Sequence, residues 1–196
     1  MAYHVYHTEA LLLGGTARGE GDRLLYCYTR ELGLVLVHAK SLREMRSRLR
    51  YALQTFSHAH VDLIHGKHGW KLISARPVDS FGAIWKEQRK RSIIAQYTEL
   101  IRRLIQGEEA QEELFDEVLE SLEHLCTLED EQELRAAELL FVVRLLHRLG
   151  YWGDTEGFEC MFGDEVWKDK QATLLARNSR TLLLANVNRA LRETQL

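Results

Sequence analysis

The pattern of hydrophobic and polar positions changes its period near residue 80, which predicts an all-β first part and a helical second part. Before that point, short runs rich in β-branched, aliphatic and aromatic residues alternate with glycines and charged residues, as in antiparallel strands. These runs cover residues 9–15, 23–29, 34–39, 58–65 and 70–75. Five such strands match an OB-type barrel, a five-stranded Greek-key fold, with an SH3-like barrel as the nearest alternative.

Glycine and proline mark the corners of this predicted barrel. Residues 66–69 read Gly-Lys-His-Gly, which suits a hairpin turn between the last two strands. The glycine-rich stretch 14–21 lacks the Lys-Ser/Thr of a phosphate-binding loop and the spacing of a dinucleotide fingerprint, so it predicts a hairpin or a bulged corner. Pro77, the only proline, fixes the end of this region, and Asp79 or Ser80 can cap the first helix.

Beyond residue 80, apolar residues recur every three or four positions, which is typical of amphipathic helices. The pattern predicts a first helix from Ile84 to Ile105 that stops at Gly107, and a second over residues 114–126. Residues 127–130 resemble a capping box with Asp in place of Glu, opening a third helix that Gly150 closes. Residues 151–163 read as a loop, 164–176 are ambiguous between helix and strand, and Asn178 or Ser179 caps a last helix.

We therefore predict an α+β multidomain chain. Residues 1–79 form an OB-fold nucleic-acid-binding domain, and residues 80–196 form an all-α bundle of four or more helices.

Charge divides the chain in the same way. Residues 1–106 hold 17 basic and 9 acidic side chains, a net +8, whereas residues 107–196 hold 9 and 20, a net −11. Such asymmetry points to a polyanion-binding surface on the first half, although a run of charges can also be a solvated face. The candidate DNA-contacting residues are Arg18, Arg30, Lys40, Arg43, Arg46, Arg48, Arg50, Lys67, Trp70, Lys71, Lys86, Arg89, Lys90 and Arg91.

Aromatic residues interleave with these basic residues. OB-fold proteins that bind single strands pair a positive groove with rings on which bases stack. The candidate rings are Tyr26, Tyr28, Tyr51, Phe56 and Trp70. Tyr26 and Tyr28 share one face of a strand, so we expect both in the core or both on the surface, with the core favoured.

The sequence carries no recognisable catalytic or metal-binding motif. It has no nucleophile elbow, H-E-x-x-H or kinase signature, and its cysteines, Cys27, Cys126 and Cys160, lie far apart, as free thiols do. His58 and His60 share a strand face, but no cysteine or carboxylate is placed to complete a metal site. We expect a non-enzymatic protein without cofactor or metal.

No apolar run approaches the roughly 20 residues that a membrane span needs, and the first residues do not resemble an export signal. We therefore expect a cytoplasmic protein.

Several motifs, in order along nearly the whole chain, resemble the bacterial RecO family. They are residues 9–14 (EALLLG), 19–25 (GEGDRLL), 28–33 (YTRELG), 48–56 (RLRYALQTF) and 146–151 (LHRLGY). The resemblance implies an OB domain followed by a helical domain, binding to single- and double-stranded DNA, and annealing of complementary strands. It also implies loading of RecA onto DNA coated by single-strand-binding protein, with RecR and that protein's acidic C-terminal tail as partners, in the cytoplasm at the nucleoid.

The chain departs from the family pattern in two places. Many RecO proteins carry a four-cysteine zinc module after the Leu-Gly-Tyr motif, whereas this chain keeps only Cys160 there, so we expect no zinc. The acidic second half is an unlikely DNA surface except near Arg177 and Arg180. A protein–protein adaptor and an RNA-binding OB protein are the alternative functions.

Overall fold

The computed structural model describes residues 4–19, 21–40, 53–79, 81–153 and 155–193. By its internal contacts the chain divides into two compact units. One unit comprises Met1–Lys86 with Thr98–Phe115, and the other comprises Glu87–Tyr97 with Asp116–Leu196. We refer to them as the barrel unit and the helical unit.

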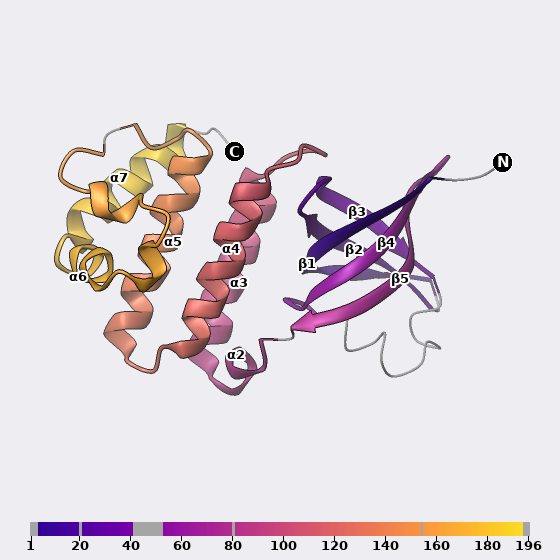
Figure 1. Cartoon of the computed structure of the whole chain (residues 1–196), viewed down its shortest axis with the longest axis horizontal. Helices are drawn as coiled ribbons and strands as arrows, with labels where there is room; N and C mark the ends of the chain where they lie inside the picture. Colours follow the sequence, from indigo (N-terminus) through magenta and orange to yellow (C-terminus); the bar gives the residue numbers. More distant parts are fainter. Residues whose placement is uncertain (1–3, 20, 41–52, 80, 154, 194–196) are drawn as a thin grey trace. The chain divides into compact units, whose positions relative to one another are not determined.

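The five strands of the barrel unit close into a barrel in the order β1-β2-β3-β5-β4 (Figure 1). Strands β3 and β5 pair in parallel, and the other neighbours pair antiparallel. This is the predicted five-stranded OB-type barrel, which is therefore confirmed. The strands are β1 (Val5–Arg18), β2 (Asp22–Thr29), β3 (Gly33–Ala39), β4 (His58–Gly66) and β5 (Gly69–Asp79).

Alternating residues of each strand fill the interior of the barrel. Leu12, Leu25, Val37 and Leu63 are buried in one apolar cluster, as a strand period of two requires. Cys27 belongs to the same cluster, and its burial raises the pKa of the thiol to about 12. Cys27 is therefore a packing residue and not a reactive nucleophile.

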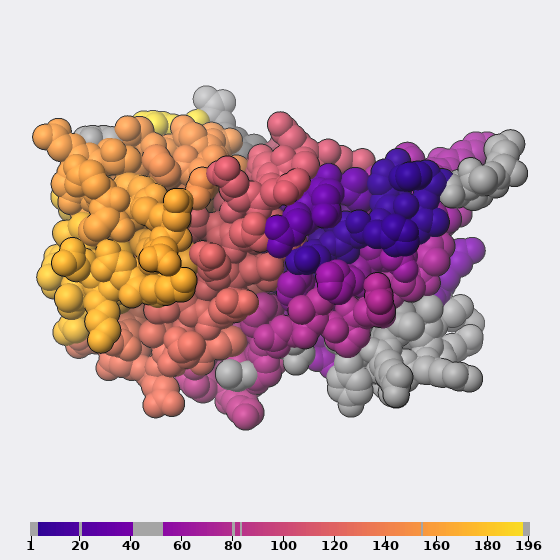
Figure 2. All heavy atoms as spheres, viewed as in Figure 1, coloured from indigo at the N-terminus to yellow at the C-terminus, as the bar shows by residue number. Residues whose placement is uncertain are grey.

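Strand β1 bends in the middle so that it can pair with two neighbours. Its first half pairs with β4 and its second half with β2, and the register shifts between Leu12 and Gly15. Gly14 has φ +98°, and a Cβ atom at Gly15 would lie 2.5 Å from the carbonyl oxygen of Leu24. The predicted bulged corner is therefore confirmed. On the face shown in Figure 2, indigo atoms of the N-terminal region lie beside magenta atoms of later barrel strands.

The barrel unit also contains residues 98–115, far beyond the barrel strands in sequence. The Leu34 amide donates to the carbonyl of Gly107 over 3.2 Å, and the rings of Tyr28 and Phe115 lie 5.5 Å apart. Gly33 has φ +67°, and a Cβ atom there would lie 2.4 Å from the carbonyl oxygen of Glu109. This segment therefore covers the outer face of the barrel where β2 ends and β3 begins.

The helices follow the predicted pattern with two differences, and the ambiguity over residues 164–176 is resolved. The first predicted helix is interrupted at Glu87, the ambiguous residues 164–176 are mainly helical, and Asp130 caps the third predicted helix. The Asp130 carboxylate accepts from the amides of Gln132 and Glu133, so the predicted box opening at Thr127 is wrong. The α-helices are α2 (Gly82–Lys86), α3 (Gln88–Leu104), α4 (Glu112–Thr127), α5 (Glu131–Arg148), α6 (Lys170–Asn178) and α7 (Arg180–Glu193); η1 (Glu159–Met161) and η2 (Val166–Lys168) are 3₁₀ turns.

Within the helical unit, α5 packs against α6 and α7. The Tyr97 ring stacks on Phe141 with centroids 3.6 Å apart, and its hydroxyl donates to the carbonyl of Ala137 over 3.2 Å. Burial raises the pKa of Tyr97 well above its usual value, so the phenol stays neutral. None of the helices that the structure describes is long and apolar enough to cross a membrane.

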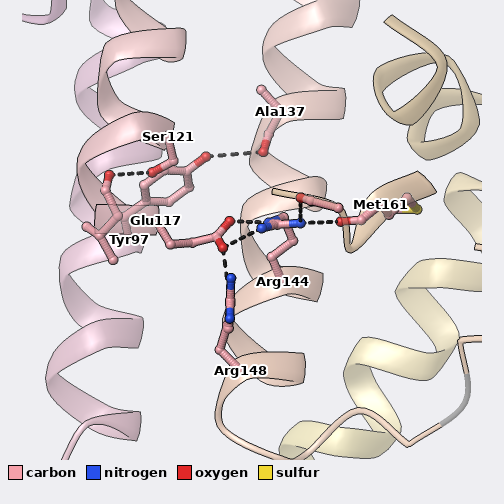
Figure 3. Close-up of polar contacts among 9 residues, drawn as sticks. Tyr97, Glu117, Ser121, Ala137, Arg144, Arg148 and Met161 are labelled. Atoms are coloured by element: carbon pink, nitrogen blue, oxygen red, sulfur yellow. Dashed lines mark hydrogen bonds and ion pairs between the residues drawn. The ribbon is translucent and has the colours of Figure 1, made fainter. Parts of the chain in front are cut away.

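A buried ion pair connects α4 and α5 to the chain that follows α5 (Figure 3). The guanidinium of Arg144 donates two hydrogen bonds to the carboxylate of Glu117, and both side chains are at least 96% buried. Arg144 Nη1 also donates to the carbonyls of Met161 over 2.7 Å and Gly163 over 2.9 Å. One guanidinium therefore fixes the last residues of the predicted loop, at Met161 and Gly163.

Candidate nucleic-acid interface

The strand register brings basic residues together at one rim of the barrel. Arg18, at the end of β1, pairs with Asp22 at the start of β2, and Arg23 pairs with Ala39 at the end of β3. His38 in turn pairs with Lys71 near the start of β5. Lys40 directly follows β3, and Lys67 lies in the two-residue turn between β4 and β5. We call Arg18, Arg23, Lys40, Lys67 and Lys71 the basic rim.

Most cations of the basic rim are available to a ligand. Arg18, Lys40 and Lys67 are exposed and Lys71 is half-buried, and none of them forms an ion pair with another described residue. Arg23 donates a long hydrogen bond of 3.4 Å to the Gly15 carbonyl. The acidic residue at this rim, Asp22, lies 2.9 Å from the imidazole of His38. The rim therefore presents positive charge that can neutralise phosphates.

The outer faces of β2 and β3 meet this rim. Cross-strand pairs there are Leu24 with His38, Tyr26 with Leu36, and Tyr28 with Leu34. The segment 98–115 covers the Tyr28 end, whereas Leu36 keeps 45% of its surface exposed. We call Leu24, Tyr26, Leu36 and His38 the open face. In OB folds this face and the adjoining loops bind oligonucleotides.

The predicted rings have different environments. Tyr26 and Tyr28 do share one face of β2, but it is the outer face, and the expectation of a common environment is wrong. Tyr28 is fully buried beside Phe115, whereas Tyr26 is half-buried. The cause is the segment 98–115, which buries Tyr28 against Phe115 but leaves Tyr26 partly exposed beneath the side chain of Arg102.

Trp70 and Phe56 are buried and offer no exposed ring for stacking. Trp70 is 6% exposed within the barrel core, and its indole N–H donates to Glu108 over 3.0 Å. Phe56 is 5% exposed. Tyr51 lies outside the described residues, as do the predicted contacts Arg43, Arg46, Arg48 and Arg50.

Two predicted basic residues at the start of α3 are engaged inside the helical unit. Lys90 is 2% exposed, with its ammonium 2.9 Å from the Glu87 carboxylate and 3.3 Å from the Cys126 carbonyl. Arg89 lies 2.7 Å from Glu138 and 3.4 Å from Glu131. A buried, paired ammonium cannot reach a phosphate, so we leave Lys90 out of the interface.

Arg30, another predicted contact, directly follows β2 and so lies at the opposite end of that strand from the basic rim. The Arg30 guanidinium lies 3.4 Å from the Glu9 carboxylate and 5.1 Å from the centroid of the Phe115 ring. Its contacts are therefore with β1 and with the segment 98–115 of the barrel unit. Lys86 and Arg91 are exposed on α2 and α3.

Arg102 is a residue that the sequence reasoning did not select. It lies in the last turn of α3, is exposed, and holds its guanidinium 3.8 Å from the centroid of the Tyr26 ring. Its neighbour Arg103 is exposed too. The pair Arg102-Arg103 was visible in the sequence as basic residues on a predicted helix, but nothing local to them indicated contact with a strand more than 70 positions earlier.

The barrel wall also holds one cluster of titratable groups. His7 Nδ1 lies 2.6 Å from Asp62 Oδ1, and the Ser74 hydroxyl donates to the other oxygen of that carboxylate. The hydrogen bonds from Ser74 and His7 hold the pKa of Asp62 below its usual value. The carboxylate lies between the hydroxyl and the imidazole, so this is not the serine–histidine arrangement of a hydrolase. Among the described residues no three potential metal ligands come together.

The fold and the site define a class of protein: an OB barrel with a basic rim, continued by a unit of helices. The family described as "Recombination protein O N terminal" matches residues 1–81, and "Recombination protein O C terminal" matches residues 86–156. The chain belongs to the RecO family.

Similar proteins carry the same family name. The chain is 34% identical over 147 residues to the DNA repair protein RecO of Heliobacterium modesticaldum, covering 75% of this chain and 52% of that protein. It is 32% identical over 145 residues to the DNA repair protein RecO of Syntrophobacter fumaroxidans, covering 74% and 56%. The chain therefore spans about half the length of the curated relatives that it matches.

Proposed function

We propose that this chain is a DNA-binding recombination mediator that acts in DNA repair by binding and not by catalysis. In this proposal it binds single- and double-stranded DNA, anneals complementary strands, and helps to load RecA onto DNA coated by single-strand-binding protein. Its partners are RecR and the C-terminal tail of the coating protein. The observation that supports the proposal most is the basic rim next to the open face of an OB barrel.

The basic rim supplies affinity that does not depend on sequence. Each Lys or Arg that neutralises a phosphate releases condensed counterions, so affinity falls as salt rises. Five contacts to single-stranded DNA correspond to a slope of log K against log salt of about −3.5. The open face adds apolar and aromatic surface for unstacked bases.

The rest of the chain has a different role in the proposal. Residues 107–196 carry a net charge of −11, which repels phosphates. We propose that residues 1–79 are the DNA-binding domain, and that the helical domain over residues 80–196 contacts protein partners through residues outside the segment 98–115, which belongs to the barrel unit.

Fluorescence anisotropy with a labelled oligo-dT at several salt concentrations tests the DNA-binding step. The triple charge reversal Lys40→Glu, Lys67→Glu and Lys71→Glu should weaken binding and flatten the salt slope. The matched control reverses three exposed cations of the helical unit, Lys168, Lys170 and Arg192, for the same change in net charge. Equal binding by the rim variant and the wild type would refute the assignment.

The same assay separates the alternative functions. An adaptor would not bind plain oligonucleotides even at low salt. An RNA-binding protein would prefer RNA over DNA of one sequence in competition.

The mediator step needs an assay of its own. Annealing of complementary strands coated by single-strand-binding protein, with and without RecR, should proceed with the wild type and slow with the rim variant. If the rim variant annealed the coated strands as fast as the wild type, the proposal of DNA binding would stand, but the proposed mediator role would be refuted.

A further inference from the structure

We propose that the stacked pair Tyr26–Arg102 is a nucleobase-binding site, on which one base of a bound single strand stacks without regard to its identity. The inference rests on the proposed DNA-binding function and goes further, because it assigns the base contact to a helix residue and a strand residue together. Both side chains belong to the barrel unit.

The geometry of the pair is that of a stack. The central carbon of the Arg102 guanidinium lies 3.8 Å from the centroid of the Tyr26 ring, which is van der Waals contact between a flat cation and a ring face. Arg102 is exposed, and among the described residues it forms no ion pair. The cation is therefore held in position by a ring and not by a carboxylate, which leaves its charge uncompensated.

The surroundings of the pair match what a base needs. Leu36 is the cross-strand partner of Tyr26 and is 45% exposed, so an apolar side chain stands beside the stack at the usual cross-strand spacing of about 5 Å. On the same outer face, His38 follows Leu36 by two residues along β3 and pairs with Lys71 of the basic rim. One single strand can thus contact the stack with a base and the rim with its phosphates.

Two features of the barrel distinguish this site from an ordinary buried contact. The other end of the same strand face is closed: Tyr28 lies against Phe115, and Gly33 admits the backbone of Glu109. At the Tyr26 end the exposed side chain of Arg102 lies over the ring, and the apolar Leu36 beside it is 45% exposed. Arginine also suits the role chemically, because its guanidinium is always charged, is weakly hydrated, and stacks on bases as well as on rings.

The test compares oligo-dT with an abasic oligonucleotide of the same length, in anisotropy titrations over a range of salt concentrations. The variants are Arg102→Ala, Tyr26→Leu and the double variant, and Arg103→Ala is the control that removes the same charge next to the stack. Thermal unfolding of each variant verifies that the barrel is folded.

We expect Arg102→Ala and Tyr26→Leu each to weaken oligo-dT binding roughly five- to hundredfold at a salt concentration where phosphate contacts contribute least. The double variant should lose little more than either single variant, because both residues serve one stack. On the abasic strand, Arg102→Ala should match Arg103→Ala, since only the phosphate contact is left to lose.

Two results would overturn the site. One is that Arg102→Ala and Arg103→Ala behave alike on both strands while Tyr26→Leu binds as the wild type does. The other is that the losses are as large on the abasic strand as on oligo-dT, which would make the pair a phosphate contact. If the wild type itself failed to bind either strand, the proposed DNA-binding function would fall along with the site.

Discussion

Replacing Arg144 by methionine should destabilise the helical unit by about 3–5 kcal/mol, because it leaves the carboxylate of Glu117 buried without its main partner. Glu117 and Arg144 are 4% and 3% exposed, so water cannot replace the lost hydrogen bonds. Arg148 lies 3.4 Å from the same carboxylate and is partly exposed, which compensates in part. The carbonyls of Met161 and Gly163 lose their donor as well.

Urea unfolding followed by circular dichroism measures this change, and amide hydrogen exchange at residues 159–163 reports on the loop itself. The exposed pair Arg135–Glu131 provides the control, because Arg135→Met removes an arginine of the same helix that is 55% exposed and should cost within about 1 kcal/mol. The double variant Glu117→Leu with Arg144→Met should regain part of the loss, since no charge is left buried. A single variant that loses less than about 1 kcal/mol would show that the pair does not hold the fold together.

Three further predictions follow from local geometry. Gly33→Ala should lower the melting temperature of the barrel, because its φ is +67° and a Cβ atom would lie 2.4 Å from the carbonyl oxygen of Glu109, whereas Gly163→Ala, with open space around it, should not. Asp130→Ala should cost about 1 kcal/mol in urea unfolding by removing the N-cap of α5; a larger loss with Thr127→Ala would contradict the capping geometry. Burial alone would raise the pKa of Glu9, but hydrogen bonding from His58 and the charge of Arg30 outweigh it and hold that pKa below its usual 4.5. The stability that Glu9 contributes is therefore present above about pH 4.5 and lost as the pH falls through the lowered pKa, so Glu9→Gln should flatten the acid limb of a stability–pH curve.

The barrel could be predicted from the sequence because its signals are local. Period-two alternation, the Gly66 to Gly69 turn and the Gly14-Gly15 corner each depend on residues close together in the chain. The helices were predicted for the same reason. The cap of α5 was misplaced by three residues, because Thr127 and Asp130 both suit the position and only the amides of Gln132 and Glu133 decide between them.

The candidate site was less predictable, because it depends on residues far apart in sequence. Alternation shows that Tyr26 and Tyr28 share a face, but not that residues 98–115 cover one of them. In the same way, the sequence predicts a binding patch from the run of cations at the start of α3. In the structure Arg89 pairs with Glu138, and Lys90 donates to the Cys126 carbonyl. Charge counts identified the basic half of the chain correctly but could not tell engaged cations from available ones.

The way the chain divides between its two units limits how this protein can be cut or recombined. Along the sequence the backbone enters the helical unit at Glu87, returns to the barrel unit at Thr98 and leaves it again after Phe115. No single break can therefore separate the units, and a fragment ending at residue 79 would lack the cover of Tyr28 and Leu34. Gene fusions that exchange an intact barrel between relatives would have to carry the stretch through Phe115, and with it residues 87–97 of the helical unit.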